Sequence, residues 1–179
     1  MERPQVITSS AWSARFMTAA IVQGAAIVAL TAVLVLGQTS FMKPEVSRVI
    51  AAGGAGTWFT FGFVIYIVVG VVGVAVSALF YQSLGNRVPK VLGWLHLVLM
   101  NAGVAAAAGM MMYAGYVGGA AALPEAVGGA GFNQGQVHGL IVPFVEPIGA
   151  SILVLLAGVL AGGAGYLMAY RRSSGDKTT

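Results

Sequence analysis

Cysteine is absent from this chain of 179 residues. Disulfide bonds, iron–sulfur clusters, thiolate metal sites and cysteine nucleophiles are therefore excluded, because each of them requires a cysteine sulfur atom. These exclusions remove much redox chemistry and one class of covalent catalysis from the functions that the sequence allows.

Charge is also scarce. Lys and Arg contribute 9 residues and Asp and Glu contribute 5, so charged residues make up 8% of the chain and hydrophobic residues 58%. An ordinary soluble domain has about 25% charged residues. The mean hydropathy is +0.88, and the uncharged runs are apolar around the whole helix instead of on one face. This composition indicates an integral membrane protein.

The few charges are clustered and leave four long uncharged runs. The runs lie between Arg15 and Lys43, Arg48 and Arg87, Lys90 and Glu125, and Glu146 and Arg171. Each run can supply the roughly 20 helical residues that cross a hydrocarbon layer about 30 Å thick. The first run also exceeds the roughly 7–15 apolar residues of a signal peptide, so a retained helix is expected.

The sequence therefore predicts an all-α fold, an integral membrane four-helix bundle that forms a single membrane domain over residues 1–179. The helices are expected over residues 16–37, 58–81, 91–117 and 146–170. Pro143 and Pro147 interrupt the last run, so the fourth helix is expected to begin near Glu146, with residues 138–145 at the interface.

The distribution of Lys and Arg predicts the orientation. Two of these residues lie in the N-terminal lead, two in the connector 82–90 and three in the C-terminal tail, whereas the loops 38–57 and 118–137 contain two between them. Because basic residues are enriched on the cytoplasmic side, we expect both termini in the cytoplasm, 38–57 and 118–137 as outer loops, and a multi-pass protein of the plasma membrane.

Small residues fall on single faces of three of the expected helices. These faces are Gly70, Gly73 and Ser77; Ala102, Ala106 and Gly109; and Gly158, Gly162 and Gly165. Lipid provides no hydrophobic drive between helices, so small side chains favour association by allowing the backbones to approach closely. Such faces fit packing within the chain and also packing against other membrane-protein subunits or a second copy. The basic residues stand singly at helix ends, so the lipid bilayer, and not nucleic acid, is the expected partner.

Few side chains offer chemistry at membrane depth. His96 lies about five residues into the third helix, where its imidazole suits an axial haem ligand or a hydrogen bond to a neighbouring helix. His138 lies at the opposite side of the membrane, so one haem held by both histidines is not expected. Gln23 and Asn101 are the polar candidates near mid-depth. A channel or transporter would need more polar side chains along its pathway.

Glu146 stands between two prolines at the expected start of the fourth helix. A carboxylate there is favoured by the helix dipole, which is one explanation for it. Glu146 and His138 are alternatively a proton-handling pair at the outer mouth of a pathway. No residue is assigned a catalytic role, and no metal site is predicted.

The segment around His96 resembles a known family. The stretch Trp94-Leu95-His96-Leu97-Val98-Leu99-Met100-Asn101-Ala102-Gly103-Val104-Ala105 is similar to the histidine-bearing helix of haem–copper oxidase subunit I. The resemblance implies that His96 corresponds to the second histidine of a His-x-His pair, which binds the low-spin haem in that family. Trp94 stands where the first histidine would be, and the copper histidines have no counterpart, so oxygen reduction is not expected.

Three functions follow as hypotheses. The leading one is a non-catalytic or accessory subunit of a larger, respiratory and oxidase-like membrane complex. The alternatives are a b-type haem protein that transfers electrons through His96, and a proton or small-ion carrier that uses His138 and Glu146. An enzymatic activity is not expected.

Overall fold

The computed structural model describes residues 10–175, and every regular element in that part of the chain is helical. The elements are α1 (Ala11–Ser40), α2 (Val46–Ala51), α3 (Gly56–Ile65), η1 (Tyr66–Gly73), α4 (Val74–Leu84), η2 (Gly85–Arg87), α5 (Lys90–Ala122), η3 (Glu125–Val127), α6 (Gln134–Ile141), η4 (Val142–Phe144) and α7 (Val145–Gly175). No strand occurs among the described residues, so the predicted all-α class is confirmed.

Four helical stretches are long and apolar enough to cross a membrane. They are Ala11–Ser40, Gly56–Leu84, Lys90–Ala122 and Gln134–Arg171, with 30, 29, 33 and 38 residues. The expectation of four membrane-spanning helices is therefore confirmed at the level of length and composition. The stretches are longer than the expected ranges, because Gly, Ala and polar residues at their ends, including Arg15, Lys90 and Arg171, continue the helices.

Helix α7 begins at Val145, next to the start expected near Glu146, and the helical stretch that contains it reaches back to Gln134. Helix α6 starts at Gln134, where the side chain of Asn133 accepts a hydrogen bond from Gln136 N and forms a capping box. Pro143 lies in the short 3₁₀ turn η4, and Pro147 lies in the first turn of α7. A proline in a first turn costs little, because its missing N–H group would have no partner there. The prolines therefore divide the stretch into segments without ending it.

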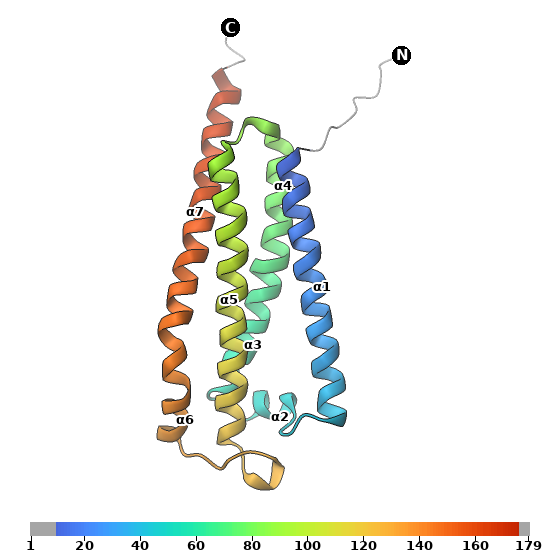
Figure 1. Ribbon diagram of the computed structural model, residues 1–179, viewed down its shortest axis with the longest axis vertical. Helices are drawn as coiled ribbons and strands as arrows, with labels where there is room; N and C mark the ends of the chain where they lie inside the picture. The colour runs from blue at the N-terminus through green and yellow to red at the C-terminus, as the bar shows by residue number, and fades with distance from the viewer. Residues whose placement is uncertain (1–9, 176–179) are drawn as a thin grey trace.

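The two ends of the molecule differ (Figure 1). The start of α1, the α4–α5 connector and the end of α7 lie together at one end, called here the terminal end. The opposite end, the loop end, holds α2, α6 and the segment between α5 and α6. Helix α5 packs mainly against α3 and α7, whereas α1 packs mainly against α4 and η1 and meets α5 through side chains, with few close backbone contacts. The bundle is therefore open between α1 and α5.

Glycines set the close approach of α7 to α5. A Cβ atom at Gly158 would lie 2.5 Å from Met100 N, and one at Gly162 would overlap the ring of His96. Gly165 is likewise buried. The small-residue face predicted for the fourth helix thus packs within the chain. The face predicted for the third helix does not, because Ala102 and Ala106 are exposed.

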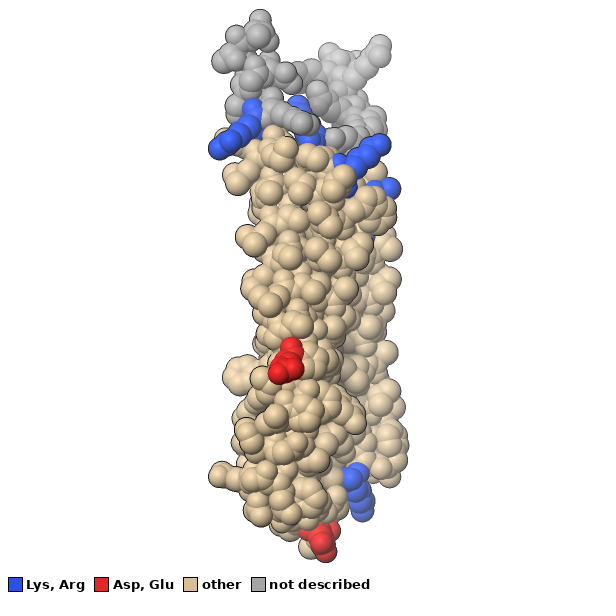
Figure 2. Space-filling view, turned by 60° about the vertical axis from the view of Figure 1, so that its left-hand side comes forward, with Lys and Arg blue, Asp and Glu red and all other residues tan. Residues whose placement is uncertain are grey.

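Charge is confined largely to the two ends (Figure 2). The terminal end includes the basic residues Arg15, Arg87, Lys90 and Arg171, and the loop end carries Lys43, Glu45, Arg48 and Glu125. Figure 2 shows Lys and Arg at the terminal end, both signs of charge at the loop end, and between them a long flank that is uncharged apart from an acidic side chain near its middle. Such a flank suits the hydrocarbon layer of a membrane.

Candidate functional site

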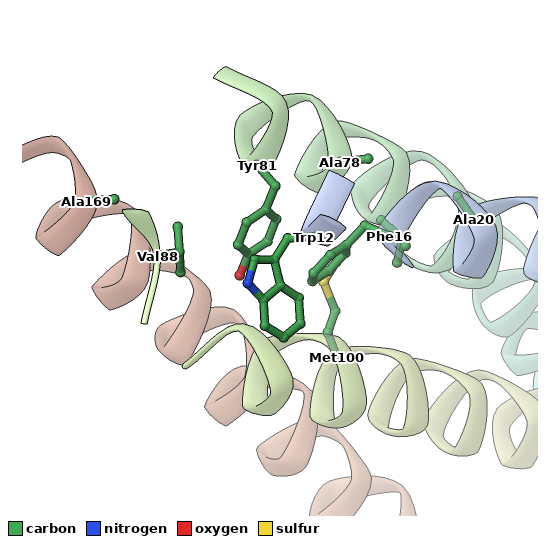
Figure 3. Packing of buried hydrophobic residues seen from close by; sticks show 9 residues of the cluster. Trp12, Phe16, Ala20, Ala78, Tyr81, Val88, Met100 and Ala169 are labelled. Carbon is green, nitrogen blue, oxygen red and sulfur yellow. The ribbon is translucent and has the colours of Figure 1, made fainter. Parts of the chain in front are cut away.

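An aromatic cluster closes the terminal end of the bundle. Trp12 and Phe16 of α1 meet Tyr81 of α4 above Met100 of α5 (Figure 3). The ring centroids of Phe16 and Tyr81 are 4.7 Å apart, and those of Phe16 and His96 are 4.8 Å apart. Tyr81 and Phe16 are completely buried. The cluster joins α1, α4, α5 and, through Ala169, α7, and its burial indicates that it packs the helices together.

His96 lies inside this cluster with only 3% of its surface exposed. Its Nδ1 atom is 3.2 Å from the Tyr81 hydroxyl, and its Nε2 atom is 3.2 Å from the Met100 sulfur. Both contacts are satisfied together when Tyr81 donates to Nδ1 and Nε2 donates to the sulfur. The Gly162 backbone presses against the ring. His96 thus has a hydrogen-bonding role between α4 and α5.

The surroundings of His96 do not fit a haem. An axial ligand needs one imidazole nitrogen that faces the iron. Here each ring nitrogen faces another side chain at 3.2 Å, and α7 approaches so closely that Gly162 has no room for a Cβ atom. The geometry of this site therefore gives the haem hypothesis no support.

Ser10 attaches the start of α1 to the cluster. The Ser10 hydroxyl donates to Tyr81 O at 2.9 Å and accepts from Ser13 N at 3.1 Å, which caps α1. Both serines are buried. A capping serine offsets the unpaired N–H groups of the first turn, and here it also links α1 to α4. A serine is a favoured N-cap residue, so Ser10 could have indicated a helix start at Ala11. The expected start at residue 16 rests on the apolar run alone.

A second polar contact lies deeper, between α1 and α5. Gln23 Nε2 donates a short hydrogen bond to Asn101 Oδ1, and Asn101 Nδ2 donates to Leu97 O at 2.6 Å. Gln23 is 7% exposed, and its Oε1 atom has no hydrogen-bond partner among the described residues. That oxygen lies against Gly70 in the π-helical segment η1, where a Cβ atom would be 2.7 Å away. One hydrogen bond thus joins the two mid-depth amides, and the Gln23 oxygen is left without a partner among the described residues.

A groove of about 700 Å³ runs along this contact. Arg15 and Thr18 lie toward the terminal end, Gln23 and Asn101 lie deeper, and Tyr66 of η1 also contributes. The remaining lining is apolar and comes from both helices. The residues are Ala14, Ala19 and Val22 of α1 and Leu97, Val98 and Ala105 of α5. This groove is the opening left by the weak packing of α1 on α5.

The Arg15 side chain is held at the groove by two indole rings. Its guanidinium carbon lies 4.6 Å from the ring centroid of Trp12 and 4.8 Å from that of Trp94. The two indoles are 5.5 Å apart in an edge-on arrangement. Cation–π contacts of this kind fix the position of a guanidinium while its hydrogen-bond donors stay available.

His138 and Glu146 are both exposed, and nothing in the described structure joins them. His138 lies on α6 and borders a hollow lined by residues 52–55, whereas Glu146 lies in the first turn of α7. Eight residues of helix separate them by about 12 Å along the axis. Within residues 10–175, no group of three His, Asp or Glu side chains could hold a metal ion. The structure therefore does not assemble the two residues into one site.

Helix α7 has two apolar seams on nearly opposite faces. The inner seam faces α5 and consists of Ile148, Ser151, Leu155, Gly158, Gly162, Gly165 and Ala169. The outer seam consists of Gly149, Leu153, Leu156, Leu160, Gly163 and Leu167. Both follow the alternating spacing of three and four residues that keeps side chains on one face of a helix. The outer seam has no neighbour within the described chain.

Sequence reasoning found His96, Gln23 and Asn101 as polar residues at depth but did not find the groove or the outer seam. The seam could have been found from the spacing of leucines and glycines between 149 and 167. The groove could not, because it depends on which helices pack together. No family model, curated protein or solved structure matches this chain.

Proposed function

We propose that this protein is a non-catalytic subunit of a larger membrane complex and binds a membrane-spanning helix of its neighbour along the outer seam of α7. The proposal also places the terminal end on the cytoplasmic side of the plasma membrane, in accordance with the positive-inside bias. The resemblance around His96 makes a respiratory complex the first assembly to search.

The outer seam is the observation that carries this proposal. Leu153 and Leu160 are 68% and 73% exposed, and the seam continues in phase over nearly three heptads. Positions beside the seam, among them Val154 and Val159, are also exposed and apolar, so the seam is set apart by its leucines and glycines and not by apolar character alone. These residues recur at the three-four spacing that keeps one helix in register with another.

Gly149 and Gly163 of the outer seam also favour close contact with another helix. A Cβ atom at Gly149 or Gly163 would meet no atom within 4 Å. Neither glycine is therefore needed for packing inside the chain, although glycine weakens a helix relative to alanine. A backbone from another subunit could approach closely at both positions, as small residues permit in membrane helix pairs.

Gentle extraction from the native membrane tests this function. On native electrophoresis we expect the wild-type chain to migrate in a discrete band larger than its monomer. Gly163→Ile should shift the chain toward the monomer, because the side chain would separate the two helices. Migration of the wild-type protein only as a monomer would contradict the proposal.

Gly109→Ile is the matched control. Gly109 of α5 also has open space around it but lies outside the outer seam. The control variant should keep the large band. Equal loss of the band in both variants would show that the outer seam has no special part in assembly.

A further inference from the structure

We propose that the groove between α1 and α5 binds one lipid with an anionic phosphate headgroup, which Arg15 contacts while one acyl chain fills the groove. This inference is independent of the subunit function, because the groove and the outer seam of α7 are formed by different residues. It rests on the shape of the groove, the position of its cation and the charge of its surroundings.

The depth of the groove matches one leaflet. From Arg15 to Gln23, α1 advances eight residues, which is about 12 Å along the axis. On α5 the lining reaches from Leu97 to Ala105, which is also eight residues and about 12 Å. A leaflet is half of the roughly 30 Å hydrocarbon layer. A helix of another protein would need a groove about twice as long to cross the membrane beside α1.

The volume and the lining also suit an acyl chain. The groove holds about 700 Å³, and small-molecule sites commonly span roughly 300–1,000 Å³. Val22 and Val98 form exposed apolar walls, and the alanines of both helices leave room for a flexible chain. The mutual hydrogen bond of Gln23 and Asn101 reduces the polarity that the deep end presents to such a chain.

Arg15 supplies the charge for the headgroup. Trp12 and Trp94 hold its guanidinium at the mouth, and tryptophan is the side chain that marks the membrane interface. Guanidinium binds phosphate strongly because several N–H donors match the phosphate oxygens. In residues 10–175, Glu45 and Glu125 lie at the loop end and Glu146 lies in the first turn of α7, so none of these carboxylates lies at the terminal end beside Arg15.

Native mass spectrometry of the full chain provides the test. The protein is released from nanodiscs that contain equal amounts of phosphatidylglycerol and phosphatidylcholine, and the lipid retained on it is counted. We expect one phosphatidylglycerol retained about fivefold over phosphatidylcholine, the factor that one basic side chain contributes near an anionic surface. Equal retention of both lipids would overturn the proposal.

Two pairs of variants locate the site. Arg15→Gln should abolish the preference and Arg15→Lys should keep part of it, whereas Arg87→Gln should leave it unchanged because Arg87 does not line the groove. Ala105→Phe should displace the acyl chain, whereas Ala106→Phe, at an exposed position outside the groove, should not.

Helical content and monodispersity of each variant, measured by circular dichroism and gel filtration, identify any that fail to fold. If Arg15→Gln and Ala105→Phe both fold and both retain phosphatidylglycerol as the wild-type protein does, the groove is not the lipid site. Equal losses in Arg15→Gln and Arg87→Gln would also overturn it, because general attraction to basic residues would then suffice. A lipid-free dimer that Ala105→Phe dissociates would show that the groove binds a second copy instead.

Discussion

Gly162 determines how closely α7 can approach α5. The ring of His96 fills the space where a side chain at this position would lie, and Gly158 meets the Met100 backbone one turn earlier. Close packing of this kind replaces the hydrophobic drive that lipid does not provide. The contact also holds His96 against Tyr81 and Met100.

Gly162→Leu should therefore destabilise the fold. Forcing extra methylene groups into a packed interior costs about 1–3 kcal/mol. Gly163→Leu is the matched control, since the neighbouring glycine faces open space. In detergent, the thermal unfolding midpoint should fall clearly for Gly162→Leu and change little for Gly163→Leu. Equal stability of the two variants would contradict the assigned packing of α7 on α5.

His96 provides a second prediction at this scale. Because both ring nitrogens are engaged by other side chains, the protein purified after expression with ample haem should show no Soret band. A Soret band that is present in the wild-type protein and lost in His96→Ala would contradict this expectation and restore the electron-transfer hypothesis. The visible absorption spectrum provides the measurement.

The sequence predicted that His96 is either a ligand or a hydrogen-bonding residue, but it could not choose between them. The choice depends on Tyr81, Met100 and Gly162, which come from three helices. Only Met100 stands at a helical spacing from His96 that sequence reasoning can use. The other two contacts are tertiary and follow from the packing order of the helices.

At the scale of the elements, α1 is the least supported of the long helices. It is attached to α4 by the Ser10 cap and the aromatic cluster, whereas its direct polar link to α5 is the contact between Gln23 and Asn101. The π-helical turn η1 lies beside this link and places Gly70 against the Gln23 oxygen. Widened helical turns of this kind are frequent where a helix must accommodate a side chain.

A double-mutant cycle measures the link between α1 and α5. Gln23→Leu and Asn101→Leu should each destabilise the protein, because each leaves one amide without its partner. The double variant should lose less unfolding free energy than the sum of the two single losses. The difference, the coupling free energy, should be about 1 kcal/mol, as for other hydrogen bonds within membranes. Reversible unfolding in mixed micelles gives the four free energies. Strict additivity would show that the contact contributes no stability.

Apolar runs predicted the number of long helices, but the ends of those helices were harder to predict. A proline usually interrupts a helix, and on that basis the fourth was expected to begin near Glu146. Helix α7 does begin at Val145, but Pro143 and Pro147 lie in first turns of consecutive segments, so the helical stretch reaches back to Gln134. The composition of a run therefore identifies a span, whereas its bounds depend on local capping and turns.

For the whole molecule, the asymmetry of basic residues predicts orientation. Because the chain has no cysteine, a single introduced cysteine would be its only thiol, and the labelling of that thiol reports the orientation of the chain. Ala126→Cys at the loop end should react with a membrane-impermeant maleimide in intact cells. Ser83→Cys at the terminal end should react only after the cells are permeabilised. The reverse pattern would contradict a cytoplasmic location of both termini.

The central claim is that the outer seam of α7 binds another membrane-spanning helix, and a photo-crosslinking scan along residues 150–168 in native membranes tests it most directly. Protein adducts of a single defined mass should peak at Leu153, Leu156, Leu160 and Leu167 and fall at Val154 and Val159, which are exposed but lie off the seam. Uniform yields along the helix, or peaks in phase with the inner seam, would contradict the claim.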